Sequence, residues 1–299
     1  MAVIFIFIDG VGLGETTDQN PFFVDSYKSF QILSDGNFSK NAKPIISGQH
    51  LFKAIDANLD VEGLPQSGTG QTTLFSGENA SKVIGKHFGP YPHSGIKYLL
   101  KEQSIFHAAT EAGKNSYFVN AYPPIFFEHA NRRNRWSCTT LMTKSADMKL
   151  NSTEEVLEEK ALTAEIVQNA WRERLGIDIP KIDATEAARR LLNVVPDYDL
   201  VMYEYYLTDK AGHNQTIEGA QLVLNTLDEF LLHIIKEKRS EDTLVITSDH
   251  GNLEDLSTKT HTRNEVPLFV IGEGIEGFKE VESLVGVKDG IMKVLDQSS

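Results

Sequence analysis

Six side chains that bind divalent metals well, three aspartates and three histidines, lie in short motifs spread along the sequence. They are Asp9 in FIDG, Asp209 and His213 in DKAGH, Asp249 and His250 in SDHG, and His261 in HTRN. Carboxylate and imidazole ligands without a thiolate suit Mn²⁺ or Zn²⁺, whereas Mg²⁺ becomes less favourable as the number of histidines rises. Two ions roughly 3.5 to 4 Å apart hold both the attacking and the leaving oxygen of a phosphoryl group. The residues therefore predict a two-metal site for phosphoryl transfer.

Each motif taken alone also has a simpler structural interpretation. Asp9 followed by Gly10 is typical of a turn after a strand, and a single histidine such as His261 is common without a ligand role. The pair Asp249 and His250 is more specific. Neighbouring side chains on a strand point to opposite faces, so these two must leave regular strand geometry to share a site, which the following glycine permits.

The elements that must position these side chains are buried strands alternating with helices. Continuous apolar runs predict strands at residues 3–8, 117–120, 243–249 and 267–272, with another that begins at Asp199. Helical spacing of apolar residues predicts helices at 104–113, 184–192 and 219–238. This alternation predicts an α/β fold with a mostly parallel sheet sandwiched by helices. The carboxyl ends of such strands form the ligand crevice, so the metal-binding motifs are expected to converge there.

The length and composition are those of one globular domain with an insertion. The chain has 299 residues, 40% of them apolar, and we expect a single domain over residues 1–299. From about residue 85 to about residue 180 the sequence changes to aromatic, proline-bearing and basic segments such as YPPIFFEHANRRNRW, followed by a charged helical stretch. We interpret part of this region as a small cap or inserted subdomain.

Charge and cysteine content exclude several classes of function. The formal net charge of −13 argues against a nucleic-acid partner, which requires a basic face for the phosphates. The apolar residues at the start of the chain form a run far shorter than the roughly 20 residues that a membrane span needs. The single cysteine, Cys138, excludes an intramolecular disulfide and a thiolate zinc site, so we expect a cytoplasmic location.

Five sequence blocks occur in an order that resembles a known enzyme family. FIDGVG, SGTGQTTLFSG, DKAGH, SDHGNLED and HTRNEVP follow one another along the chain. In this order they resemble the signature of the alkaline phosphatase superfamily of two-metal enzymes. Within it the chain is most similar to cofactor-independent phosphoglycerate mutase, with phosphopentomutase close behind. The resemblance implies an alkaline phosphatase-like fold and covers the first ten or so residues, the region around 64–80, and nearly all of 197–275.

The resemblance also implies a role for each residue of the site. One divalent ion, Mn²⁺ or Zn²⁺, would be held by Asp209, His213 and His261, and the other by Asp9, Asp249 and His250. Ser67 would bridge to the second ion as the catalytic nucleophile, and Thr69 is the competing hydroxyl and a candidate substrate contact. The nucleophile block itself departs from the mutases, which have Ser-Glu-Val-Gly-His where this chain has SGTGQ.

Several reactions remain open under this resemblance. A phosphoserine attacked by water makes a phosphatase, and one attacked by a second hydroxyl of the retained substrate makes a phosphomutase. A phosphodiesterase or nucleotide pyrophosphatase of the same superfamily is an alternative, as is a non-catalytic metal-binding relative. In each enzyme interpretation the substrate is a small phosphorylated compound. Arg132, Arg133 and Arg135 are candidate phosphate contacts because guanidinium groups bind phosphate in bidentate fashion, although a solvated basic loop explains them as well.

Overall fold

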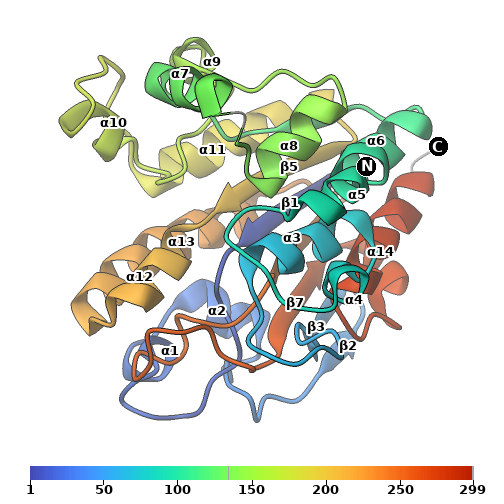
Figure 1. The fold of residues 1–299 in the computed structure, drawn as a ribbon. Helices are drawn as coiled ribbons and strands as arrows, with labels where there is room; N and C mark the ends of the chain where they lie inside the picture. The colour runs from blue at the N-terminus through green and yellow to red at the C-terminus, as the bar shows by residue number, and fades with distance from the viewer. Residues whose placement is uncertain (134, 298–299) are drawn as a thin grey trace.

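A central β-sheet organises the chain, as the computed structural model shows for residues 1–133 and 135–297, without the side chains of 131 and 133 (Figure 1). The strands are β1 (Val3–Ile8), β2 (Ile45–Ser47), β3 (His50–Ile55), β4 (Ser116–Phe118), β5 (Leu200–Tyr205), β6 (Thr243–Ser248) and β7 (Val266–Ile271). Within the described residues they form one seven-stranded sheet in the order β2-β3-β7-β6-β1-β5-β4. The four strands β6, β1, β5 and β4 run parallel to one another.

The sheet is mixed at its other side, which the sequence pattern did not reveal. Strand β7 runs antiparallel to both β6 and β3, and β2 runs antiparallel to β3. The mostly parallel α/β sheet is confirmed for the centre of the sheet. Because β7 is reversed, its start lies at the same edge as the end of β6. The loop that carries His261 is therefore held at the carboxyl edge of the parallel strands.

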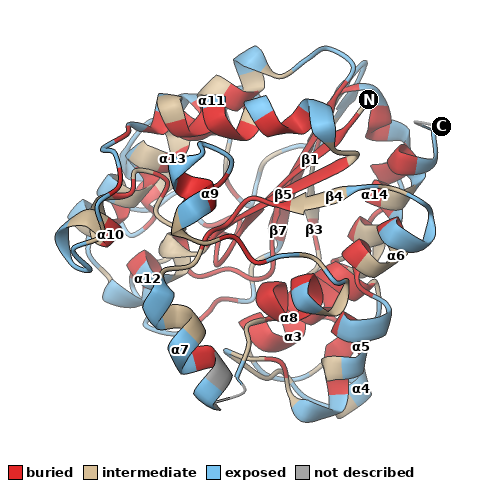
Figure 2. Cartoon of the chain, turned by 90° about the horizontal axis from the view of Figure 1, so that it is seen from above, coloured by how far each residue is buried: buried red, intermediate tan, exposed pale blue. Residues whose placement is uncertain are grey.

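Helices cover both faces of the sheet. One face, which includes Ile4, Ile6 and Ile8 of β1, packs against α2 (Lys28–Leu33), α11 (Ala184–Val194) and α13 (Ile217–Glu237), and α12 (Leu207–Asn214) packs on α13. The other face, which includes Phe5 and Phe7, packs against α3 (Ser67–Ser76), α5 (Lys97–Glu102), α6 (Ile105–Glu111), α8 (Cys138–Ser145) and α14 (Val285–Asp296). Figure 2 shows the buried strands enclosed between these layers. β1 is buried along its whole length, which explains its uninterrupted apolar sequence.

The remaining helices are short. They are α1 (Pro21–Val24), α4 (Ala80–Ile84), α7 (Pro124–Arg133), α9 (Thr153–Leu157) and α10 (Asn169–Glu173), with 3₁₀ turns at Ser94–Ile96, Val195–Asp197 and Glu273–Phe278. No helix among the described residues is both long and apolar enough to cross a bilayer.

The stretch from about residue 85 to about residue 180 contributes to the main layers and also extends beyond them. Helices α5, α6 and α8 pack on the sheet, and β4 is its last strand. Around α9 and α10 a separate small apolar cluster forms from Ala121, Val156, Ala161, Trp171 and Ile179. Helices α7, α9 and α10 lie together at one side of the molecule (Figure 1). We propose that these three helices are the part of the stretch that acts as a cap.

Candidate metal centre

Strand pairing brings the first set of candidate ligands together. β1 and β6 are neighbours, and their last residues, Ile8 and Ser248, lie opposite each other in the register. Asp9 and Asp249 follow immediately and so lie side by side at the carboxyl edge. The Ser248 hydroxyl donates to the carbonyl of His250 at 3.1 Å and accepts from the N–H of Val11 at 2.9 Å. These bonds fix the two loops relative to each other.

The first donor group consists of Asp9, Asp249 and His250. The Nε2 atom of His250 lies 3.3 Å from Oδ1 of Asp9 and 3.5 Å from Oδ2 of Asp249. The Oγ atom of Ser67, the first residue of α3, lies 3.0 Å from the same Nε2. All four side chains are buried. The structure therefore brings the sequence-predicted nucleophile against the sequence-predicted ligands of one ion.

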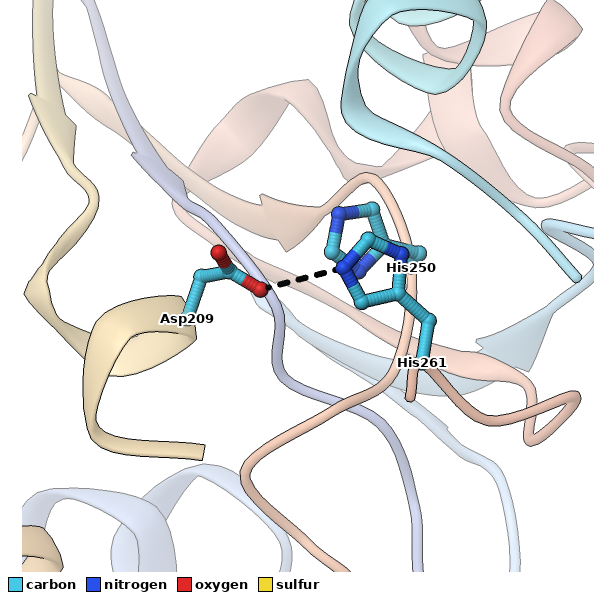
Figure 3. A group of neighbouring side chains, drawn as sticks. All are labelled: Asp209, His250 and His261. Atoms are coloured by element: carbon cyan, nitrogen blue, oxygen red, sulfur yellow. Dashed lines mark ion pairs between the residues drawn. The ribbon is translucent and has the colours of Figure 1, made fainter. Parts of the chain in front are cut away.

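The second donor group consists of Asp209, His213 and His261. Asp209 and His213 are four residues apart in α12 and share one face of that helix. The carboxylate of Asp209 lies 3.4 Å from Nε2 of His261 and 3.4 Å from Nε2 of His213, and the two Nε2 atoms are 3.3 Å apart. Figure 3 shows Asp209 pointing at His261, whose ring stacks on that of His250. The two imidazole centroids are 3.8 Å apart, so the two donor groups adjoin.

Backbone carbonyls orient the three imidazoles. Nδ1 of His213 lies 2.8 Å from the carbonyl oxygen of Lys259. Nδ1 of His261 lies 2.7 Å from that of Pro65, and Nδ1 of His250 lies 3.3 Å from that of Gly251. A carbonyl can only accept, so each Nδ1 carries a proton, and each Nε2 faces the site, where it can offer its lone pair to a metal ion once it has lost any proton of its own. Metal-ligating histidines are held in this way by their second nitrogen.

Burial makes the carboxylates of the first group difficult to ionise without a cation. Burial, together with the charge of Asp249, raises the pKa of Asp9 to about 7. Burial likewise raises the pKa of Asp249 to about 6. Burial works to lower the pKa of His250, but the neighbouring carboxylates of Asp249 and Asp9 outweigh it and raise the pKa to about 10. The first group therefore favours a positive charge beside the carboxyls of Asp9 and Asp249.

The second group behaves differently from the first. Burial works to raise the pKa of Asp209 as well, but the hydrogen bond from His261 and the positive charge of His250 outweigh it. The pKa of Asp209 falls below its usual range, so this carboxylate is ionised. The two groups thus differ in their charge when no ion is bound.

The residues present fit divalent metal ions. The carboxylate oxygens Asp9 Oδ1 and Asp249 Oδ2 are buried and accept no hydrogen bond from the described residues. Buried carboxylate oxygens are normally paired or bound to a metal. Two sets of ligand atoms, one from Asp9, Asp249 and His250 and one from Asp209, His250 and His261, each lie within 4.8 Å of one another. His250 thus lies within reach of both groups. An oxygen and nitrogen set of this kind suits Mn²⁺ or Zn²⁺.

Two glycines allow the backbone to approach these ligands closely. Gly10 has φ +73°, a left-handed conformation, and a Cβ atom there would lie 2.8 Å from Cβ of Asp209. A Cβ atom on Gly70 in α3 would lie 2.8 Å from the carbonyl oxygen of Asp249. These glycines let α12 and α3 pack directly against the loops that follow β1 and β6.

Three polar side chains that the sequence analysis did not single out hold the ligands in place. Gln71 donates from Nε2 to Oδ2 of Asp9 at 3.0 Å, and Asn252 donates to Oδ1 of Asp209 at 2.6 Å. Glu254 is buried and accepts from the N–H groups of Gly12 at 2.9 Å and of Asn252 at 2.8 Å. The only sequence signal for Gln71 is its spacing four residues after Ser67, which places both on one face of α3 but does not distinguish Gln71 from a surface position.

A cavity of about 650 Å³ opens above the metal centre. Asp9, Ser67 and Asp209 form part of its lining. Glu204, near the end of β5, lines it as well, and burial raises the pKa of this carboxyl to about 8, so it carries a proton at neutral pH. An acid within the apolar run VMYEYY was the sequence signal for Glu204, and it was missed.

Of the other predicted substrate contacts, some line this cavity and some do not. The Thr69 hydroxyl donates to the carbonyl of Gln66 at 3.2 Å and accepts from the N–H of Phe88 at 3.1 Å, and Thr69 is not among the residues that line the cavity. Arg135 lines the cavity, whereas Arg132 is exposed and does not. The side chain of Arg133 lies outside the described part of the structure.

Comparison with known sequences gives a family match along almost the whole chain. A family model described as the Metalloenzyme superfamily matches residues 1–296. The chain is also similar to the 2,3-bisphosphoglycerate-independent phosphoglycerate mutase of Desulforudis audaxviator (strain MP104C), at 30% identity over 105 residues. The aligned segment is 33% of this chain and 21% of that protein, so the chain spans about a fifth of the length of the curated relative.

Comparison with solved structures gives a match of fold. The PH0037 protein from Pyrococcus horikoshii superimposes with a TM-score of 0.61 at 12% identity, covering 100% of this chain and 97% of that one. Alkaline phosphatase from the Antarctic bacterium TAB5 superimposes with a TM-score of 0.58 at 13% identity, covering 99% of this chain and 97% of that one. The expected alkaline phosphatase-like fold is confirmed.

Proposed function

Because the chain belongs to the Metalloenzyme superfamily, we propose that its buried centre, loaded with two divalent ions, transfers the phosphoryl group of a small phosphate ester through Ser67. The observation that carries this proposal is the position of Ser67. Its hydroxyl oxygen lines the cavity and lies 3.0 Å from Nε2 of His250, beside Asp9 and Asp249, each of which has one carboxylate oxygen that accepts no hydrogen bond from the described residues. A hydroxyl among candidate metal ligands and at the start of a helix is suited to nucleophilic attack on phosphorus.

The residues around Ser67 position both partners of the reaction. Among the described residues the N–H groups of Ser67 and Gly68 at the start of α3 have no acceptor, whereas that of Thr69 donates to the carbonyl of Phe88 at 2.8 Å, so the first two would face a phosphate bound at the helix start. Gln71 holds the carboxylate of Asp9 from one turn further along α3. The bound ions would supply charge neutralisation for the phosphate oxygens and would favour the ionised form of the serine hydroxyl.

The proposed reaction has two balanced steps. In the first, the Ser67 hydroxyl loses its proton to solvent, an Oγ–P bond forms, the ester P–O bond breaks, and the departing alcohol takes a proton from solvent. In the second, the oxygen of water or of a hydroxyl attacks phosphorus and its proton is lost to solvent, the Oγ–P bond breaks, and the Ser67 oxygen takes a proton from solvent. If that nucleophile is water, phosphate is released and the protein is a phosphatase. If it is another hydroxyl of the retained substrate, the protein is a phosphomutase.

Several finer features belong to the same proposal. We propose Mn²⁺ or Zn²⁺ as the ions, with Asp9, Asp249, His250 and Ser67 at one and Asp209, His213 and His261 at the other. The stacking of His250 on His261 supports two ions that lie next to each other. A cytoplasmic location, expected from the single cysteine, and the absence of a nucleic-acid partner, expected from the net charge of −13, complete it.

The proposal is tested by trapping the phosphorylated protein. Metal-loaded protein is mixed with a panel of phosphate esters, quenched in acid and digested, and phosphorylated peptides are identified by mass spectrometry. We expect phosphate on Ser67, and we expect both the label and ester turnover to disappear in Ser67→Ala. Thr69→Val is the matched control, because the Thr69 hydroxyl bonds only to backbone groups among the described residues, and this variant should still be labelled. Turnover that persists in Ser67→Ala would refute the assignment of the nucleophile.

A further inference from the structure

The walls of the cavity above Ser67 are unusually rich in aromatic rings. Tyr91, Tyr122, Phe126, Trp171 and Tyr206 all line it. They come from separate parts of the chain: the loop after α4, the start of α7, α10 and the start of α12. Rings from separate elements that meet around one space are a feature of the tertiary structure and leave no signature in any single sequence segment.

These rings are arranged as flat walls. Tyr122 and Phe126 stack on each other, with centroids 4.2 Å apart and an angle of 25° between their planes. Trp171 is 6% exposed and belongs to the small apolar cluster around α9 and α10, which fixes its position. The proposed cap therefore presents rings to the cavity above a polar floor.

Two cations at the cavity lie over rings that line it. The guanidinium of Arg135 lies 4.1 Å from the centroid of Tyr91, and Nζ of Lys210 lies 4.9 Å from that of Tyr206. Both side chains line the cavity and are exposed, as is Arg174. In a chain of net charge −13 this local positive charge suits an anionic ligand.

The size and lining of the cavity differ from what a short polar ester requires. Its volume of about 650 Å³ lies within the range of about 300 to 1,000 Å³ that is common for sites of drug-sized organic ligands. A ligand with only a few carbons and several hydroxyls would be bound by many hydrogen-bonding groups. Aromatic walls instead favour a flat ring, which has a large apolar surface to bury and can stack against the rings of the wall.

Given phosphoryl transfer at Ser67 as proposed above, we propose that the organic part of the substrate carries a flat aromatic ring, which packs between Phe126 and Trp171. A nucleoside and an aryl alcohol share this chemistry. The phosphate would lie on the floor beside Ser67 while the ring occupies the space under α7 and α10, and Arg135 at the rim would contribute positive charge. Stacking of a base on an aromatic side chain strengthens binding by about 5- to 150-fold.

The test measures binding separately from turnover. The Ser67→Ala protein, loaded with Mn²⁺, is titrated by calorimetry with adenosine monophosphate, 4-nitrophenyl phosphate, ribose 5-phosphate and inorganic phosphate. We expect the two ring-bearing phosphates to bind at least about fivefold more tightly than ribose 5-phosphate. Tighter binding of the nucleotide would identify a nucleoside as the source of the ring, and tighter binding of the nitrophenyl ester would identify an aryl group.

Variants of the walls then locate the ring. Adding Trp171→Leu should remove the preference for ring-bearing phosphates and leave the affinity for inorganic phosphate unchanged. Phe126→Leu should weaken the preference in the same way, and this half-buried residue serves if Trp171→Leu fails to fold. Tyr98→Leu is the matched control, because Tyr98 is an exposed aromatic residue that does not line the cavity.

The outcomes separate this inference from the proposed function. If Ser67 becomes phosphorylated but phosphates with and without a ring bind equally, the ring is refuted and phosphoryl transfer stands. If no ester is turned over while the ring preference is present and is lost in Trp171→Leu, the ring-binding cavity stands and phosphoryl transfer is refuted.

Discussion

Replacing Asp249 with asparagine should have opposite effects on the metal-free and the metal-loaded protein. Asp249 is completely buried, and burial raises the pKa of its carboxyl from 3.8 to about 6. Because that pKa is raised in the folded protein, its contribution to stability is fully present below pH 3.8 and is lost as the pH rises through about 6. At neutral pH the charged carboxylate therefore destabilises the metal-free fold. Asparagine has nearly the same shape, keeps an acceptor for the N–H of Gly10, and carries no charge.

The pKa shift gives the size of the effect. Because the pKa of Asp249 is about two units higher in the fold, the unfolding free energy at pH 7 changes by an order of magnitude of about 3 kcal/mol. For a chain of this length we expect a rise in melting temperature of about 5 °C for metal-free Asp249→Asn. With metal the order should reverse, because bound metal at about 1,000 times its Kd stabilises the wild type by about 4.1 kcal/mol, which exceeds the difference of about 3 kcal/mol, and the variant loses most of this gain.

Calorimetric melting in chelator and in excess Mn²⁺, at pH 5 and pH 7, measures both effects. The difference between the metal-free proteins should be largest at pH 7 and smaller at pH 5, where Asp249 of the wild type is mostly protonated in the fold. Asp242→Asn is the matched control. Asp242 is another buried aspartate, but it is paired with Arg239 at 2.7 and 2.8 Å, so its replacement should destabilise the protein with or without metal. If metal-free Asp249→Asn melts below the wild type at pH 7, the argument is wrong.

Three further predictions concern the supports of the site, its protons and the core. Glu254→Gln replaces one acceptor oxygen by a donor facing the N–H groups of Gly12 and Asn252, so metal affinity measured by chelator competition should fall about 10- to 100-fold; unchanged affinity would remove Glu254 from its positioning role. The metal-induced rise in melting temperature should grow between pH 5.5 and 8, because metal must displace the proton that Asp9 holds with a pKa of about 7; a rise that is constant with pH would contradict this. Phe7→Ala, which removes a fully buried ring 5.2 Å from that of Phe75, should lower the unfolding free energy in urea by about 3 to 5 kcal/mol, whereas Leu222→Ala, at a side chain 72% exposed, should change it little.

Much of the fold was predictable because its signals are local. The apolar run of β1 is uninterrupted because both faces of that strand are buried. The apolar residues of α13 recur at helical spacing because only one face of that helix is buried. Each pattern can be read within a single segment. The reversed direction of β7 was not predictable in this way. A strand has the same residue pattern in either direction, so only pairing with β3 and β6 decides it. That reversal places the His261 loop at the metal edge.

The ligands were likewise predictable as residue types at strand ends, but their supports were not. Gln71 and Glu254 are polar residues in loops or helices with no pattern that distinguishes them from surface positions. They are recognisable only because folding places them against Asp9 and against the glycine loop. The Thr69 hydroxyl illustrates the converse, since its type suggested a site role while the structure gives it two backbone partners.

The sequence by itself determined the chemical types of the donors, their order along the chain and the strands that carry them. The tertiary structure alone decided that His250 lies within reach of both donor groups, that Ser67 rather than Thr69 lies beside it, and that aromatic rings from separate segments enclose the cavity above them. The physical reason is the length scale of the information. Residue type and periodicity are local properties of the chain, whereas the contact between Ser67 and His250 joins residues 183 positions apart and exists only because α3 packs against the loop after β6.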